Sequence, residues 1–132
     1  MPTSIYIVED HEFMRRSLAQ FIGGLPDLTV AGTAGSAKEA LGQLGEAAVE
    51  LVLIDTRLPD MNGIELVEEL RKRWPRLRCL ILSGHGETHY VERAMKAGAQ
   101  GYVLKGNPNE IPEAIRRVLG GEVYISAQEA NR

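Results

Sequence analysis

Charged and hydroxyl side chains follow four of the five short apolar runs in this sequence. Glu9 and Asp10 follow the first run, Asp55 the third, Ser83 the fourth and Lys105 the fifth. Short apolar runs are typical of strands buried in a parallel sheet. Because the carboxyl ends of parallel strands meet at one edge, where open α/β sheets bind their ligands, we expect these side chains to lie close together.

This set of side chains suits a divalent cation and a phosphoryl group. Acids that lie close together repel one another unless a cation is present, and Mg²⁺ prefers oxygen ligands. Lys105 supplies a positive charge that suits phosphate, Ser83 can donate a hydrogen bond, and an aspartate can itself form an acyl phosphate. Taken singly, each residue is more often structural, and Asp10 could simply cap a helix. Only their joint placement favours a functional site.

The rest of the sequence predicts alternating strands and helices. The expected strands are Ile5–Val8, Leu28–Ala31, Leu51–Ile54, Cys79–Leu82 and Tyr102–Leu104. Apolar residues recur with helical period between and after these runs, most weakly over Thr88–Ala97. This alternation predicts an α/β fold with a doubly wound five-stranded parallel sheet and helices on both faces.

Local signals indicate where the helices begin and end. Three pairs match the spacing of a capping side chain and an acid three residues later: Ser36 with Glu39, Asn62 with Glu65, and Asn107 with Glu110. Gly98 and Gly120 are expected to end helices in the left-handed conformation. We predict one domain over residues 1–126, with 127–132 as a tail or the start of a linker. Residues after Gly121 show no strong period.

The composition narrows the classes of function. The chain has 132 residues and a net charge of -3, which argues against direct binding to DNA or an anionic membrane. It has one cysteine, Cys79, so no internal disulfide is expected, and its apolar neighbours favour an inert buried thiol. No apolar run approaches a membrane span and the N-terminus lacks a signal peptide pattern. We therefore expect a cytoplasmic protein.

Five motifs together resemble the receiver domain of two-component response regulators. They are Ile7–His11, Leu53–Asp55, Leu58–Gly63, Ile81–Gly84 and Gly101–Lys105. The resemblance covers nearly the whole chain and implies a flavodoxin-like receiver fold with strand order 2-1-3-4-5. It departs from many receivers after the lysine, where Gly106 replaces a proline.

The resemblance also implies the roles of the site residues. Asp55 is the phosphoacceptor, assisted by Lys105 and Ser83. The Mg²⁺ ligands are Asp10, Asp55 and the backbone carbonyl of Arg57, with Glu9 binding directly or through water. Ser83 and Tyr102 form the switch, while Arg57 and His85 modulate the rate of dephosphorylation. His11 is interpreted as a surface or capping residue rather than a metal ligand.

The resemblance implies a signalling module rather than an enzyme, with Mg²⁺-dependent self-phosphorylation and dephosphorylation on Asp55 only. A sensor histidine kinase donates the phosphoryl group and the phosphorylated domain forms a homodimer. Sequences such as Asp10–Glu12 and the run from Gly120 to Ser126 are similar to NarL/FixJ-type regulators, which carry a LuxR-type DNA-binding domain that this chain lacks. The alternative is a stand-alone receiver that acts through protein–protein contacts.

Three other classes are less consistent with the residues. A phosphohydrolase of the haloacid dehalogenase type needs a second aspartate two residues after the nucleophile, and that position is Arg57. A phosphorylation-independent interaction domain would not need the intact set of Asp10, Asp55, Ser83 and Lys105. A flavin-binding domain of the same topology needs a phosphate-binding loop after the first strand, where the acidic residues of this chain would repel phosphate.

Overall fold

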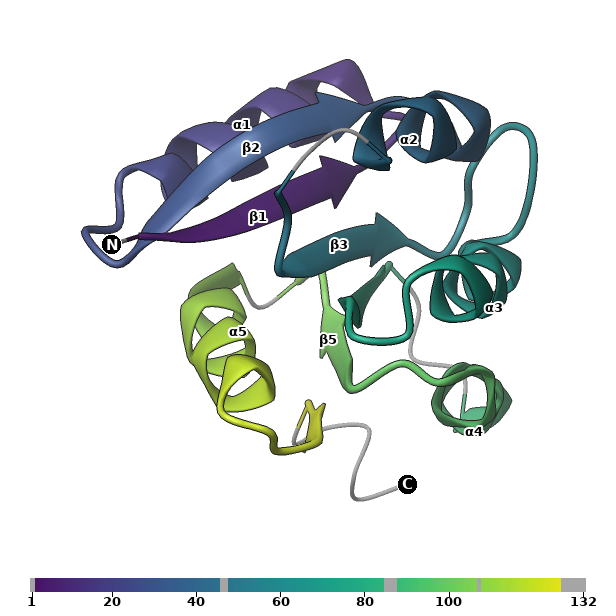
Figure 1. Cartoon of the computed structure of the whole chain (residues 1–132). Coiled ribbons are helices and arrows are strands. Elements are labelled where there is room, and N and C mark those ends of the chain that lie inside the picture. Colours follow the sequence, from purple (N-terminus) through teal and green to yellow (C-terminus); the bar gives the residue numbers. More distant parts are fainter. Residues whose placement is uncertain (1, 46–47, 85–87, 107, 127–132) are drawn as a thin grey trace.

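The computed structural model describes residues 2–45, 48–84, 88–106 and 108–126. Its strands form one parallel sheet in the order β2-β1-β3-β4-β5-β6 (Figure 1). Their bounds are β1 Thr3–Val8, β2 Leu28–Ala34, β3 Leu51–Asp55, β4 Arg78–Ser83, β5 Gly101–Leu104 and β6 Tyr124–Ile125. The predicted five strands and their order are confirmed, and a sixth strand is added at the β5 edge.

Helices cover both faces of the sheet (Figure 1). They are α1 Glu12–Gly23, α2 Ala37–Leu44, α3 Gly63–Arg73, α4 Thr88–Ala97 and α5 Ile111–Leu119, with a 3₁₀ turn over Pro108–Glu110 before α5. α2, α3 and α4 pack on one face, while α1 and α5 pack on the other. In the part of the chain that the structure describes, no helix has the length and apolarity needed to span a membrane.

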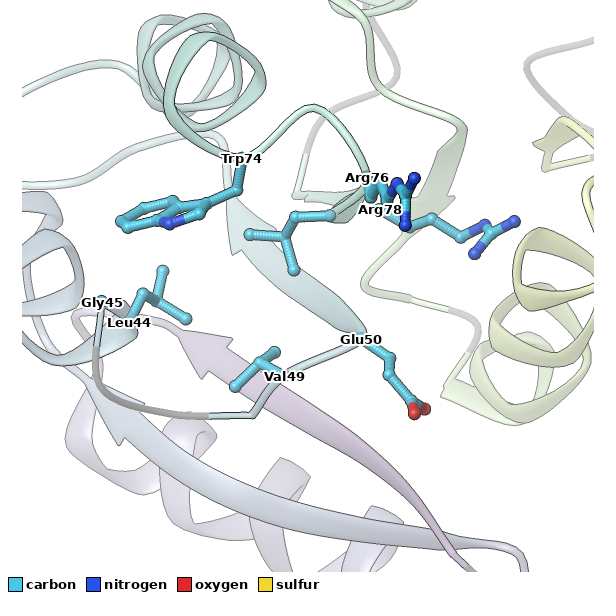
Figure 2. A pocket seen from close by; sticks show the side chains of 8 residues that line it. Leu44, Gly45, Val49, Glu50, Trp74, Arg76 and Arg78 are labelled. Atoms are coloured by element: carbon cyan, nitrogen blue, oxygen red, sulfur yellow. The ribbon is translucent and has the colours of Figure 1, made fainter.

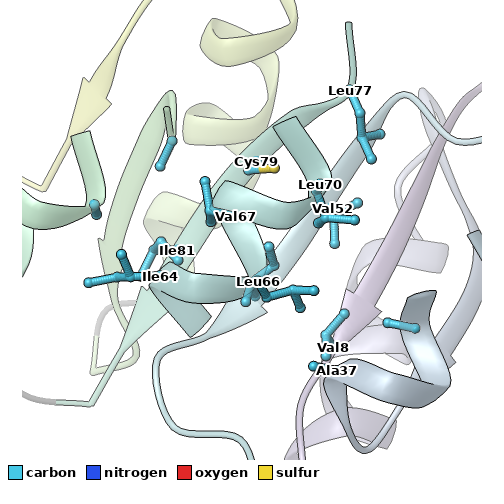
Figure 3. Close-up of a cluster of buried hydrophobic side chains, with 14 of the residues drawn as sticks. Val8, Ala37, Val52, Ile64, Leu66, Val67, Leu70, Leu77, Cys79 and Ile81 are labelled. Carbon is cyan, nitrogen blue, oxygen red and sulfur yellow. The ribbon is translucent and has the colours of Figure 1, made fainter. Parts of the chain in front are cut away.

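The central strands β3 and β4 are buried on both faces, which fixes the position of their carboxyl ends. Alternate residues of β3 enter opposite cores: Val52 contacts the α2–α3–α4 side (Figure 3), and Leu53 contacts the α1–α5 side. Burying one such side chain contributes roughly 1.5–3 kcal/mol, and a shift of one residue would exchange the two faces. Cys79 is buried in the same way, and burial raises the pKa of its thiol to about 12, as expected for an inert cysteine.

Helix ends agree only partly with the predictions. Ser36 Oγ accepts a hydrogen bond from Glu39 N (3.2 Å) and Asn62 Oδ1 accepts one from Ile64 N (2.7 Å), so both caps are confirmed. The predicted Asn107 cap lies outside the described residues. Gly98 has the expected left-handed backbone, with φ 109°.

The C-terminal segment contradicts one prediction and adds a strand that the sequence did not indicate. Gly120 has a right-handed φ of -79°, and its N–H bonds back to α5, so the left-handed residue is Gly121 with φ 95°. The segment after it shows no strong period in the sequence, yet Tyr124–Ile125 forms the short strand β6. Tyr124 N donates to Gln100 O and Ser126 N donates to Tyr102 O, each at 2.9 Å. A two-residue strand is too short to leave a periodic signal in the sequence.

Candidate functional site

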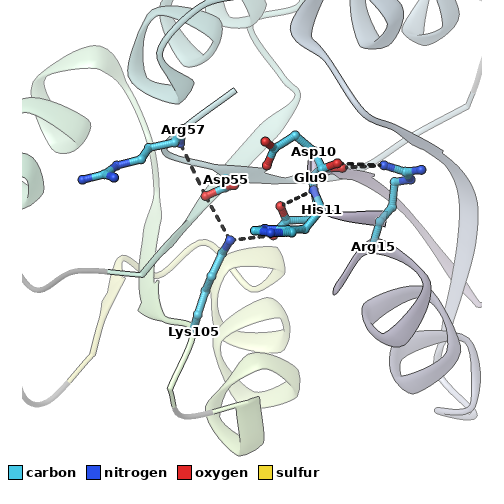
Figure 4. Close-up of polar contacts among 7 residues, drawn as sticks. All are labelled: Glu9, Asp10, His11, Arg15, Asp55, Arg57 and Lys105. Atoms are coloured by element: carbon cyan, nitrogen blue, oxygen red, sulfur yellow. Dashed lines mark hydrogen bonds and ion pairs between the residues drawn. The ribbon is translucent and has the colours of Figure 1, made fainter. Parts of the chain in front are cut away.

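Three charged side chains meet at the carboxyl ends of β1, β3 and β5, as the sequence predicts. Lys105 Nζ lies 2.6 Å from Glu9 Oε1 and 3.1 Å from Asp55 Oδ1 (Figure 4). The Glu9 side chain is fully buried, the Asp55 side chain is 7% exposed and that of Lys105 is 20% exposed. One ammonium therefore neutralises two carboxylates that are largely shielded from water.

Burial and ion pairing shift the pKa values of this group. Burial raises the pKa of Glu9, and the hydrogen bonds from Lys105 Nζ and His11 N offset that effect only in part. Burial disfavours the charge on Lys105, but its hydrogen bond to Glu9 and the nearby charge of Asp55 outweigh it, so the pKa of Lys105 is raised. The ammonium is thus held in its charged form beside Asp55.

Asp10 and His11 lie on the loop that leads from β1 into α1. Both are exposed, and ligand atoms of Glu9, Asp10 and His11 lie within 4.8 Å of one another. Asp10 does not cap α1, because the N-cap position is His11, which makes no side-chain cap hydrogen bond. His11 is a surface residue as expected, but its ring also belongs to this acidic cluster, which the sequence analysis did not predict.

The loop after β3 brings its backbone to Asp55. Arg57 N lies 3.4 Å from Asp55 Oδ1, whereas the exposed Arg57 guanidinium points away from the carboxylates (Figure 4). Gly63 N donates to Thr56 O at 2.9 Å, and a Cβ on Gly63 would lie only 2.2 Å from Asp55 O. A glycine is therefore needed where the first turn of α3 passes directly behind Asp55.

The predicted switch residues lie at the ends of β4 and β5. Ser83 is buried and its carbonyl accepts a hydrogen bond from Lys105 N at 2.8 Å. Tyr102 is completely buried. Strand pairing aligns Ser83 with Leu104 and places Tyr102 beside Ile81. His85 lies outside the described residues.

The site opens into a pocket of about 260 Å³. Its lining residues are Asp10, His11, Asp55, Thr56, Arg57, Gly84 and Lys105. Water occupies about 30 Å³ per molecule, so the pocket has room for a phosphoryl group and a partly hydrated cation. A carboxylate nucleophile beside an ammonium, open to such a space, can accept a phosphoryl group.

A second, larger pocket lies at the opposite edge of the sheet (Figure 2). It measures about 350 Å³, and Trp74, Leu77, Arg76 and Arg78 are among its lining residues. None of the site residues predicted from the sequence lines it. The chemistry that the sequence predicts is therefore confined to the carboxyl edge.

This fold and site define a class of protein: an α/β domain with carboxylates and a lysine at the carboxyl edge of its parallel sheet. The family described as the response regulator receiver domain matches residues 5–116. The chain belongs to this family and is a receiver domain of the two-component response regulators.

Individual relatives are consistent with this assignment. The chain is 39% identical to the DNA-binding transcriptional activator DevR/DosR of Mycobacterium tuberculosis over 96% of its own length. It is 31% identical to the nitrate/nitrite response regulator protein NarL of Escherichia coli over 95% of its length. It spans 58% of each of these two proteins.

A solved structure extends the similarity to three dimensions. The crystal structure of a LuxR-family two-component response regulator from an Aurantimonas species superposes with a TM-score of 0.95 at 31% sequence identity. The superposition covers 99% of this chain and 94% of that one. The receiver fold and its similarity to NarL- and LuxR-type regulators are therefore both shown.

Proposed function

We propose that this domain accepts a phosphoryl group on Asp55 from a sensor histidine kinase. The observation that carries the proposal is the position of the Asp55 carboxylate. It ends a central strand, lines the pocket and lies 3.1 Å from the Lys105 ammonium. An Asp55 oxygen attacks phosphorus while the bond from phosphorus to the donor nitrogen breaks. Lys105 stabilises the charge on the transferring group, as cations do in phosphoryl transfer.

The residues present fit a magnesium ion, because the carboxylates of Asp10 and Asp55, which are hard oxygen donors, line the same pocket. We propose that Asp10, Asp55 and the Arg57 carbonyl would hold it. Both Glu9 oxygens already accept hydrogen bonds, from Lys105 Nζ at 2.6 Å and His11 N at 3.1 Å, which favours an indirect role for Glu9 through water. A bound Mg²⁺ supplies positive charge that offsets the charge of the phosphoryl oxygens.

The same geometry supports the proposed signalling roles. Phosphorylated Asp55 is expected to draw the Ser83 hydroxyl toward it and to shift the packing of Tyr102. Ser83 bonds to Lys105 through the backbone, and β4 pairs with β5, which supports a coupled movement. Control of dephosphorylation by Arg57 and His85 stays a prediction.

The output belongs to the longer proteins that this chain resembles. DevR/DosR is described as a DNA-binding transcriptional activator, and we propose that this receiver likewise controls a DNA-binding domain in a transcription regulator. Homodimerisation on phosphorylation, a cytoplasmic location and a domain boundary after Ser126 are parts of the same proposal. The alternative is a stand-alone receiver that signals through protein–protein contacts.

The test is phosphorylation by a small phosphodonor such as acetyl phosphate, followed by intact-protein mass spectrometry. The wild type should gain one phosphoryl group with Mg²⁺ and none in excess chelator. Asp55→Asn should gain none, while Asp27→Asn, which changes an exposed aspartate paired with Arg116, should behave as wild type. Unchanged phosphorylation of Asp55→Asn would refute the proposal.

A further inference from the structure

Arg15 lies behind the acidic loop and holds its backbone. The side chain comes from the first turns of α1, and its Nη1 donates to Glu9 O at 2.9 Å and contacts Asp10 O at 3.5 Å (Figure 4). A single guanidinium thus contacts both consecutive carbonyls of the loop that carries the proposed metal ligand.

Packing restricts where this guanidinium can lie. A Cβ on Gly35, in the loop between β2 and α2, would lie 3.1 Å from Arg15 Nη1. Arg15 therefore fills the space between two loops and is only half exposed. The next residue differs: the Arg16 side chain is 79% exposed and contacts Glu12 at 3.9 Å.

The loop needs such support because no hydrogen bond or ion pair within the described residues holds the Asp10 carboxylate in place, whereas both oxygens of Glu9 are bound. The direction of the Asp10 carboxylate is consequently set by the backbone to which it is attached. Arg15 is the side chain that contacts this backbone.

We propose that Arg15 is a positioning residue for the metal site and orients Asp10 by bracing the Glu9 and Asp10 carbonyls. The inference rests on the proposed function, because it assumes that Asp10 binds the cation. Groups that orient metal ligands change metal affinity without touching the ion. The charge of Arg15 has the opposite effect, because a nearby cation repels a dication. Replacing Arg15 with an uncharged residue should therefore weaken metal binding if Arg15 positions Asp10, and strengthen it if only the charge of Arg15 matters.

The experiment measures the affinity of the full chain for Mn²⁺ without any phosphodonor, from the electron paramagnetic resonance signal of free Mn²⁺. Arg15→Met should weaken binding roughly tenfold. Arg15→Lys, which keeps the charge but loses the planar fork, should lie between Arg15→Met and wild type. Arg16→Met is the matched control and should bind as wild type. Gly35→Ala, which displaces the guanidinium without altering α1, should weaken binding by a smaller factor.

A second measurement separates positioning from loss of fold. Thermal unfolding in chelator should show each variant folded at the assay temperature. In phosphorylation by acetyl phosphate, the Mg²⁺ concentration at half-maximal rate should rise in Arg15→Met, while the rate at saturating Mg²⁺ stays close to wild type. A smaller folded fraction would lower the saturated rate instead.

The outcomes distinguish this inference from the proposed function. If Arg15→Met binds Mn²⁺ as tightly as wild type or more tightly, the proposed role of Arg15 is wrong. The proposal that Asp55 is phosphorylated is not affected by that result. If Arg15→Met fails to fold, the same criterion applies to Arg15→Lys and Gly35→Ala. A wild-type protein that binds no Mn²⁺ overturns both the proposed metal site and this inference.

Discussion

Lys105 neutralises the charge of two carboxylates whose side chains are nearly excluded from water. Removing Lys105 should therefore lower the free energy of unfolding. In Lys105→Met, Glu9 stays buried but loses its closest partner, which lies at 2.6 Å. Breaking a buried ion pair destabilises a protein because it leaves an uncompensated charge. Since Lys105 is partly exposed, we expect the free energy of unfolding at pH 8 to fall by about 2 kcal/mol, less than for a fully buried pair.

The loss of stability in Lys105→Met should depend on pH, because it arises from the charge on Glu9. At a pH below the ordinary pKa of glutamate, Glu9 is protonated in both the folded and unfolded states, and the variant buries no unpaired charge there. As pH rises from the ordinary pKa of glutamate toward the raised pKa of Glu9, the folded variant retains a proton that the unfolded chain releases, so its stability falls. Urea unfolding at about pH 3.5, below the ordinary pKa of glutamate, and at pH 8 measures the difference, with Lys96→Met as an exposed control. An equal deficit at both pH values would contradict the argument.

The convergence of Glu9, Asp55 and Lys105 could be predicted from sequence because each ends or directly follows a buried strand. The places of His11 and Arg15 could not. Both lie beyond the end of β1, where the direction of a side chain depends on hydrogen bonds within a loop rather than on period. The only signal for Arg15 is its position one turn into α1, which it shares with many surface residues.

At the scale of elements, Asp60 fixes the start of α2 from a distant loop. Its carboxylate accepts hydrogen bonds from Ala37 N at 3.0 Å and Lys38 N at 2.8 Å. Slight burial opposes the charge of Asp60, but these backbone N–H groups outweigh it and lower its pKa. A carboxylate at a helix N-terminus is favourable, and loss of a cap costs about 1 kcal/mol.

We therefore expect Asp60→Asn to lower the free energy of unfolding at pH 7 by about 1 kcal/mol. An acid with a lowered pKa stabilises the folded state above its unfolded pKa and loses that contribution as pH falls through its folded pKa. The difference between wild type and Asp60→Asn should thus vanish toward pH 3. Urea unfolding across this range tests it, with Glu68→Gln as the exposed control. A difference that persists in acid would show that the charge is irrelevant.

The Glu110 carboxylate attaches the short strand β6 to the rest of the domain. It accepts hydrogen bonds from Tyr124 Oη at 2.9 Å and Ser126 Oγ at 2.8 Å. Ser126 Oγ in turn accepts from Leu104 N at 3.3 Å. Because a hydrogen bond contributes roughly 1 kcal/mol, Glu110→Ala should speed amide exchange at Tyr124 and Ser126 by at least tenfold.

Hydrogen exchange measured by NMR tests this prediction. Glu113→Ala, in the first turn of α5, is the control, since Glu113 pairs with Arg117 instead. Unchanged exchange at Tyr124 and Ser126 in Glu110→Ala would show that β6 is held by its strand pairing alone. The attachment of β6 beside Tyr102 and Leu104 also gives the predicted switch strand a direct contact with the C-terminal segment.

Elements that depend on contacts between distant residues are those that the sequence analysis missed. The Ser36 and Asn62 caps bond to residues two or three positions away, and both were predicted correctly. The Asp60 cap spans more than twenty residues, and β6 depends on an existing sheet edge formed by β5. Neither leaves a local pattern, so only the folded chain reveals them.

For the whole molecule, strand order follows from the pattern of burial. β3 and β4 are apolar on both faces, which places them at the centre, while β2 is half-exposed and lies at an edge. Right-handed crossovers then leave few arrangements, and the family resemblance selects among them. The same strand order brings the carboxyl ends of β1, β3 and β5 together, so the acidic and basic residues at these ends lie at one pocket.

That arrangement pairs Glu9 and Asp55 with Lys105 and places Asp10 on the same pocket, so the folded state holds an excess of negative charge that the unfolded chain disperses. A cation that binds only the folded state stabilises it by an amount that depends on its concentration relative to Kd. At ten times Kd, Mg²⁺ should raise the free energy of unfolding by about 1.4 kcal/mol, and chelator should reverse the gain.

Unfolding in urea at matched ionic strength, with NaCl in place of MgCl₂, separates this binding from general screening of charge. Asp10→Asn should abolish the Mg²⁺ increment because it removes a proposed ligand, and it should raise stability in chelator because it relieves repulsion in the cluster. Glu12→Gln is the matched control: its carboxylate is two residues away, exposed and paired with Arg16, so its increment should equal that of wild type. An increment that survives in Asp10→Asn would place the ion elsewhere on the surface, and an increment that NaCl reproduces would show general screening of charge instead of binding.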